Sequence, residues 1–423
     1  MSSSAPPVVT PLEQSIEKAL DYSPQLQALR HNHGAIQFDL KQSKAGYLPS
    51  VDLLLGYGLE QHSDKVSRQT RADPANTDWD PLGEATLSLT QKVYDGGETR
   101  QQVSIQKAIL ASAGFDIQDA TQAIALNAIH AHLEVYRQRE LVALAEKNLT
   151  VHQDIFHSLS EMEKAGAGNI ADVTHTQARM ARAQSNLFIS KADLTRAMVH
   201  YTRVVGTKPG ELAVAEVPKK MPTSLAEALE WTEQRNPEIL AFNAKLNEAD
   251  ARVALARSSD KPKINIKLNS SYNDQLEGDH SWQNTNDAML ILHWNLFNGG
   301  QDSAKKNATL SRKRQIRSNR DDTLFELREA TADAWATYIS LQKQKKAYQS
   351  AVVYSQKTFD AYLKQFSVSQ RSLLDVLSAE NDYFQSAGRL ITVSVDETIA
   401  AYQILRLGKA VQIPRHHRSS HSN

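Results

Sequence analysis

The chain has 423 residues, and its 48 Lys and Arg residues balance 48 Asp and Glu residues, so the formal net charge is zero. Zero net charge argues against nucleic acid as the main partner, because such binding depends largely on neutralising phosphates. The chain has no cysteine, which excludes disulfides, thiolate metal sites, thiol nucleophiles and a cysteine that could carry a lipid.

The first stretch, "MSSSAPPVVTPLEQS", lacks the charged n-region and the apolar h-region of a signal peptide. The sequence contains no run of about 18 consecutive apolar residues, which a transmembrane helix would need. The expectation is therefore either a cytoplasmic protein or an exported one whose signal has been removed.

The sequence contains one pattern twice. "PLEQSIEKALDYSPQLQAL" from Pro11 resembles "SLAEALEWTEQRNPEILAF" from Ser224, and the copies differ in length mainly in two polar loops, Glu60–Gly83 and Asn273–Asn286. We expect an N-terminal tail over residues 1–11, a first repeat over 12–210, a linker over 211–223, a second repeat over 224–408 and a C-terminal tail over 409–423.

Each repeat begins with a short helical pair, which ends near Gly46 or Ser259. Two strands, a Gly-Gly pair and two long helices follow. In the first repeat we predict strands at about 50–59 and 84–94 and helices at about 97–163 and 170–206. In the second repeat we predict strands at about 263–272 and 287–297 and helices at about 300–366 and 371–407.

The first three strands alternate strictly; for example, Val51, Leu53 and Leu55 share one side. Such alternation gives one apolar and one polar face. The long helices are too long for a compact domain, since about 65 residues span roughly 100 Å. Seam positions from Leu327 to Phe366 are spaced alternately by four and three residues, which is the coiled-coil period and favours packing between long helices.

A soluble four-stranded sheet is one interpretation of the strands. The other is a bilayer crossing, which an alternating strand of about ten residues also suits. A sheet in lipid must close on itself, and single-chain barrels start at about eight strands. Four strands in a membrane would therefore require several copies of the chain to share one barrel.

The motifs "VYDGG" from Val93, "LFNGG" from Leu296 and "SVSQRSLLDVLSAENDYFQS" from Ser367 resemble the TolC family of bacterial outer-membrane channel proteins. The resemblance extends from Leu12 to Gly408. It implies a mainly α-helical fold with a transmembrane β part and a homotrimer, in which four strands per chain form one twelve-stranded β-barrel. A long α-helical coiled-coil tunnel would continue this barrel into the periplasm.

The resemblance also assigns the tip of the second helical hairpin. Asp375 matches an aspartate ring that narrows the periplasmic entrance, and Arg371 and Phe366 match residues that tie neighbouring helices. Asp172 is the repeat equivalent of Asp375 and the expected partner of Arg371. The alternative is that both aspartates are solvated surface residues.

Two further groups mark the membrane part. A strand must turn into a helix at each Gly-Gly pair, which favours residues without a Cβ; these are Gly96, Gly97, Gly299 and Gly300. Aromatic residues near the strand ends fit an interfacial belt, although ordinary strand-end aromatics are the alternative; these are Tyr57, Tyr94, Trp294 and Phe297.

The leading hypothesis is an outer-membrane exit duct of a type I secretion system that exports protein cargo. The resemblance implies an inner-membrane adaptor with an ABC or proton-driven transporter as partner, outer-membrane lipid as surroundings, and no nucleic acid. The alternatives are the outer-membrane component of a multidrug efflux pump and a cytoplasmic coiled-coil scaffold. No HExxH, GxSxG or cysteine nucleophile is present, so we assign no catalytic residue, metal or cofactor.

Overall fold

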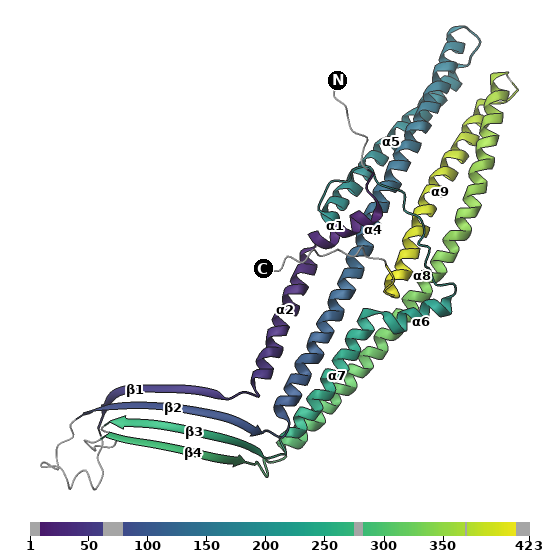
Figure 1. The fold of residues 1–423 in the computed structure, drawn as a ribbon. Coiled ribbons are helices and arrows are strands. Elements are labelled where there is room, and N and C mark those ends of the chain that lie inside the picture. Colours follow the sequence, from purple (N-terminus) through teal and green to yellow (C-terminus); the bar gives the residue numbers. More distant parts are fainter. Residues whose placement is uncertain (1–8, 62–78, 275–281, 369, 412–423) are drawn as a thin grey trace. The chain divides into compact units, whose positions relative to one another are not determined.

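The structure is a computed structural model that describes residues 9–61, 79–274, 282–368 and 370–411 (Figure 1). The chain divides into two compact units. The first, here called the helical unit, comprises residues 1–30, 115–240 and 322–423. The second, here called the strand unit, comprises residues 31–114 and 241–321 and contains the sheet.

The two halves of the chain have the same order of elements with nearly equal lengths. The first half contains α1 (Leu12–Tyr22), α2 (Pro24–Ala45), β1 (Ser50–Glu60), β2 (Asp80–Tyr94), α4 (Glu98–Lys164) and α5 (Ile170–Val205). The second half contains α6 (Leu225–Arg235), α7 (Pro237–Ser258), β3 (Lys263–Asp274), β4 (Trp282–His293), α8 (Gln301–Ser367) and α9 (Leu373–Leu407). The first long helices, α4 and α8, have 67 residues each, so the repeat extends to the length of the elements.

Three strand boundaries differ clearly from the sequence-based prediction. β2 begins at Asp80 rather than near residue 84, and β4 ends at His293 rather than near residue 297. β4 also begins earlier, at Trp282, because its polar start pairs with β3 from Asp274↔Trp282 onwards. Backbone pairing decides where β2 and β4 begin, whereas the polar composition of these two starts favoured a loop. Most of the predicted loop Glu60–Gly83 lies outside the described residues.

The predicted coiled-coil seam of α8 is confirmed. All twelve seam positions are buried or half-buried, and five of them are buried: Leu327, Thr331, Ala334, Tyr338 and Phe359. Three apolar clusters of the helical unit join these helices. The largest joins α1, α4, α5 and α9, the second joins α6, α8 and α9, and the third joins α4, α8 and α9 near the hairpin ends.

A hydrogen-bonded group lies inside the largest cluster. The His132 Nε2–H must donate to the Ala213 carbonyl oxygen (2.9 Å), because a carbonyl can only accept. Nδ1 is then an acceptor for the Ser15 hydroxyl (2.9 Å), which in turn accepts from the Tyr201 hydroxyl (2.9 Å). The group ties α1, α4, α5 and the linker together without a net charge.

Candidate functional site

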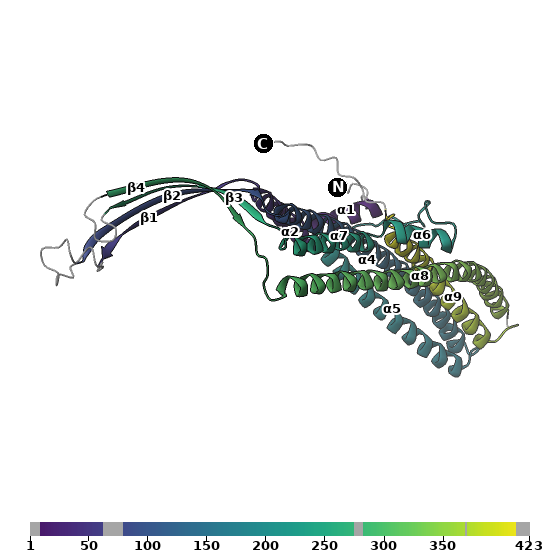
Figure 2. The ribbon, with the colours of Figure 1, turned by 90° about the horizontal axis from the view of Figure 1, so that it is seen from below.

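The four strands form one antiparallel sheet with the order β1-β2-β3-β4 (Figures 1 and 2). Its central pair, β2 with β3, joins the first repeat to the second; for example, Leu89 lies opposite Leu268. β1 and β4 each have a neighbour on one side only within the described part of the chain. Both edges therefore present backbone donors and acceptors that this chain does not pair.

One face of the sheet is apolar and open. Leu53, Leu55 and Leu290 are 65%, 69% and 70% exposed, respectively. The register places the apolar positions of the four strands in common rows, such as Leu89↔Leu268 and Leu268↔Ala288. The opposite face carries mainly polar and charged side chains, although Leu54, Met289 and Ile291 also lie on it. An exposed apolar face of this extent indicates a site of contact with a membrane or with another protein.

Aromatic residues lie at both ends of the apolar face. Tyr57 is 87% exposed near the loop end of β1, and at the same end of the sheet the rings of Tyr272 on β3 and Trp282 on β4 stack with a centroid separation of 6.2 Å. Trp282 was not among the predicted belt residues, because its position falls in the predicted loop Asn273–Asn286. Its period-two relation to Leu290 and Leu292 could have revealed it.

The other end of the sheet carries the remaining predicted aromatics. A register shift between Lys92 and Tyr94 places Tyr94 opposite Ile264 on the apolar face. Trp294 and Phe297 follow β4 instead of lying in it, and Phe297 is 85% exposed. The Trp294 Nε1–H donates to the Asp260 carbonyl oxygen (3.0 Å), as expected for an aromatic residue with a polar tip.

The strand-to-helix junctions combine a cap with left-handed glycines. Asp95 Oδ1 accepts from the Gly97 amide (2.9 Å), and its Oδ2 accepts from the Thr99 amide (2.7 Å), so Asp95 caps α4. Burial alone would raise the pKa of Asp95, but the hydrogen bonds from Thr99 and Gly97 outweigh it and lower this pKa. Asn298 takes the same place before α8, where it accepts from the Asp302 amide (3.4 Å).

All four predicted junction glycines have positive φ, at 68° and 90° for Gly96 and Gly97 and at 67° and 85° for Gly299 and Gly300. This conformation strains residues with a Cβ. At the second junction, residues 294–298 form no regular element between β4 and Gly299. The second junction is thus longer than the sequence suggested.

The two predicted tip aspartates lie at the start of α9 and α5. Asp375 is in the first turn of α9, where its amide donates to Ser372 Oγ (3.2 Å) and its Oδ2 accepts from the Ser372 hydroxyl (2.9 Å). Asp172 is in the first turn of α5, which Asn169 caps by accepting from the Ala171 amide (2.9 Å). Both carboxylates also suit the positive end of a helix dipole.

Arg371 contacts its own hairpin instead of the expected partner Asp172. Its Nε–H donates to Gln365 Oε1 (3.1 Å), NH1 lies 3.8 Å from Asp375 Oδ2, and the guanidinium stacks 4.3 Å from the centre of the Tyr362 ring. Tyr362 was not among the predicted tip residues. It lies one helical turn before Phe366 on the same seam, and Phe366 itself packs against the third apolar cluster.

A buried polar group lies close to this tip. Glu380 of α9 accepts from Asn148 Nδ2 (2.5 Å) and lies 3.3 Å from His152 Nε2, both on α4. The Glu380 residue is only 3% exposed. The first and second helical hairpins therefore share a polar contact that water does not reach.

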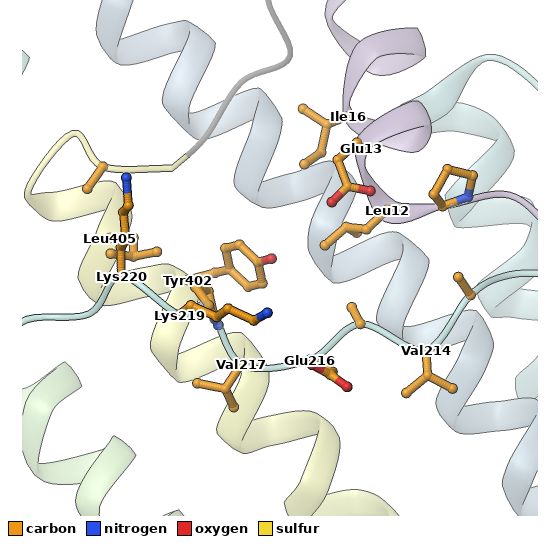
Figure 3. A pocket seen from close by; sticks show the side chains of 15 residues that line it. Leu12, Glu13, Ile16, Val214, Glu216, Val217, Lys219, Lys220, Tyr402 and Leu405 are labelled. Atoms are coloured by element: carbon orange, nitrogen blue, oxygen red, sulfur yellow. The ribbon is translucent and has the colours of Figure 1, made fainter.

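The helical unit also contains a cavity of about 530 Å³ between α1, the linker and the end of α9 (Figure 3). Glu13, Glu216, Lys219 and Tyr402 are among its lining residues. Burial, with a smaller contribution from Glu13, raises the pKa of Tyr402. The lining carries both acidic and basic side chains, so its charge does not indicate whether a ligand would be an anion or a cation.

Residues 15–207 and 228–407 match the outer membrane efflux protein family. The chain is 26% identical over 337 residues to the outer membrane efflux protein BepC of Brucella suis, covering 79% of this chain and 74% of BepC. It is 24% identical over 396 residues to the alkaline protease secretion protein AprF of Pseudomonas aeruginosa, covering 89% and 80% of the two chains.

A solved structure of CusC shares the fold, with a TM-score of 0.82 at 16% identity, covering 96% of this chain and 95% of CusC. The described helices include none that is long and apolar enough to cross a membrane.

The chain belongs to the outer membrane efflux protein family and is a bacterial outer-membrane channel protein that extends into the periplasm, not an enzyme. The predicted resemblance to the TolC family is confirmed. The predicted alternative of a cytoplasmic scaffold is wrong. Channels of this family are trimeric and work with inner-membrane adaptor and transporter complexes.

Proposed function

We propose that three copies of this chain share one twelve-stranded barrel and form the outer-membrane exit duct of a type I secretion system for protein cargo. The observation that carries this proposal is a four-stranded sheet with an exposed apolar face and two edges to which no other described strand pairs. Lipid would cover the apolar face, and β4 of one copy would pair with β1 of the next, because an open edge is not tolerated in lipid.

The likeness to AprF supports the secretion role, since AprF is a protease secretion protein by name. The transporter partner would then be of the ABC type, joined through an inner-membrane adaptor. The duct itself would supply no energy and would open at its tip, where Asp172, Phe366, Arg371 and Asp375 lie. The likeness to BepC, an outer membrane efflux protein by name, favours a second candidate, the outer-membrane component of a multidrug efflux pump.

The trimer is tested first. Full-length protein should leave bacterial membranes only with detergent and should have the mass of three chains in light scattering after subtraction of bound detergent. A monomer that stays soluble without detergent would refute the shared barrel.

Topology is tested by single-cysteine labelling, which is clean because the chain has no cysteine. A cysteine at Ala75, which lies outside the described residues, should react with an impermeant maleimide on intact cells. A matched cysteine at Ala167, in the turn between α4 and α5, should react only after the outer membrane is permeabilised. Equal labelling on intact cells would contradict the orientation.

The two candidate roles are separated by deleting the gene for this chain. Loss of extracellular protein with unchanged susceptibility to toxic small solutes supports secretion. Increased susceptibility with an unchanged set of secreted proteins supports efflux. Crosslinking followed by mass spectrometry should then identify the inner-membrane adaptor.

A further inference from the structure

The polar face of the sheet is sorted by charge along its strands. Asp52, Ser88, Asn269 and Asp287 occupy one row across β1, β2, β3 and β4, through the pairs Asp52↔Ser88, Ser88↔Asn269 and Asn269↔Asp287. The Asn269 amide donates to Asp287 Oδ2 (3.4 Å), which places the two side chains on the same face. The row therefore carries a carboxylate at each edge of the sheet.

A third carboxylate extends this acidic region toward the loop end. Glu84 pairs with Gly56 on β1, and a Cβ at Gly56 would collide with the Glu84 carboxyl group. The glycine thus leaves room for Glu84 to lie across the polar face. Glu84 is four residues from Ser88, or about 13 Å along an extended strand.

The cations of this face lie on the other side of the row. Lys267 is two residues from Asn269, and Lys92 is four residues from Ser88, both toward the strand-to-helix junction. Among the described residues, no ion pair joins either lysine to Asp52, Glu84 or Asp287. The polar face is therefore basic toward the junction and acidic toward the loops.

We infer that Asp52, Glu84 and Asp287 determine the ion preference of the barrel lumen and give it a preference for cations from mid-strand outward. The inference rests on the proposed trimer, in which the polar face lines the lumen. With these three residues, three chains would then contribute six carboxylates in the mid-strand row and three nearer the loops. Their fields reinforce one another because the two carboxylate rows, about 13 Å apart, are separated by little more than the Debye length of about 10 Å at moderate salt.

The charge division also has a direction. A cation that moves outward meets the lysines before the carboxylates, whereas an anion meets an attractive region first and a repulsive one last. A pore with charge placed asymmetrically along its axis conducts unequally at opposite voltages. We therefore expect rectification in addition to cation preference, and we expect anionic solutes to leave through this barrel less readily than cationic ones.

The test uses the full-length protein reconstituted in planar lipid bilayers, with reversal potentials measured in a KCl gradient. The variant Asp52→Asn/Asp287→Asn should lower the cation-to-anion permeability ratio at least about twofold, and Glu84→Gln should lower it less. Lys267→Gln should raise the ratio. The matched control is Asp274→Asn, which removes one carboxylate from the opposite, apolar face of β3 and should leave the ratio unchanged.

All variants are also measured in an Asp375→Ala background, so that the proposed tip ring does not set the ratio. Ratios that stay the same in the double variant, Glu84→Gln and Lys267→Gln, in pores of normal trimer mass, would overturn this inference alone. Failure of the unaltered chain to form trimeric pores would instead overturn the proposed function on which it rests. Should the double variant not assemble, Glu84→Gln and Lys267→Gln decide the question by their opposite shifts.

Discussion

Gly96 and Gly299 occupy equivalent positions in the two repeats but have different surroundings, which allows backbone strain to be separated from steric crowding. Their φ angles are 68° and 67°, so an alanine at either position meets the same conformational strain. A Cβ at Gly96 would lie 2.8 Å from the Lys261 Cβ and 2.9 Å from the Ser258 carbonyl oxygen, whereas a Cβ at Gly299 meets nothing within 4 Å.

The expected cost follows from these contacts. The left-handed conformation costs a residue with a Cβ about 1–2 kcal/mol, which Gly96→Ala and Gly299→Ala share. Crowding adds about 1–3 kcal/mol at Gly96 only. The Ser258 oxygen cannot move away easily, because it accepts from the Lys261 amide (3.2 Å) in the turn before β3. We therefore expect Gly96→Ala to destabilise the strand unit about twice as much as Gly299→Ala.

Thermal unfolding of the trimer in detergent gives the ranking, and hydrogen–deuterium exchange localises the effect. Gly96→Ala should increase exchange at the start of α4 and in the turn before β3, while Gly299→Ala should affect only the start of α8. Gly97→Ala is a further control, because its φ is 90° and nothing lies within 4 Å. Equal losses of stability for Gly96→Ala and Gly299→Ala would show that contact with Ser258 and Lys261 is unimportant and would refute the reasoning.

Three further predictions concern the helical unit. Burial lowers the pKa of His132, so as pH falls below about 6.5 the unfolded chain binds a proton before the folded chain does, and the stability that His132 contributes should decrease. His132→Gln should therefore weaken the pH dependence of the unfolding midpoint between about pH 7.5 and 5. An unchanged pH dependence in this variant would contradict the prediction. Glu380→Ala leaves Asn148 and the His152 imidazole without an acceptor and should lower the free energy of unfolding in urea by about 2–5 kcal/mol. Glu380→Gln keeps an acceptor and should lower it by less than half as much. Equal losses in the two variants would mean that packing, and not the polar contact, sets the cost. Asp375→Ala should lower cation preference in single-channel recordings. Arg371→Ala should raise conductance only partially, because an exposed charge pair contributes only about 0–1 kcal/mol. Unchanged currents in both variants would show that these residues are not part of the gate.

Local patterns were sufficient for much of the architecture. The period of the α8 seam depends only on residues three and four apart, so the burial of Leu327 through Phe366 could be predicted from the sequence. Strand alternation is equally local, because neighbouring side chains of a strand point to opposite faces. The repeat predicted two junctions, and the structure shows why the motif reads Asp or Asn before Gly-Gly: one residue caps the helix and the next two adopt positive φ.

Contacts between distant segments could not be predicted in this way. The Glu380 carboxylate meets Asn148 over 232 positions of the chain, and Ser15 meets Tyr201 over 186. Neither residue carries a local signal, because burial of a polar side chain depends on which helix packs against it. Arg371 shows the reverse case: the sequence analysis expected the distant Asp172, but the nearby Tyr362 and Asp375 are its partners.

The sequence by itself determined the repeat, the long helices, the alternating strands and the outer-membrane family, because each depends on a periodic pattern or a short motif within one segment. Only the tertiary structure decided that β2 pairs with β3 and in which register, since the hydrogen bonds of a sheet join backbones and leave little trace in side-chain identity. That register places Asp52 and Asp287 in one row although 235 residues separate them in the chain, and it thereby creates the charge division of the polar face.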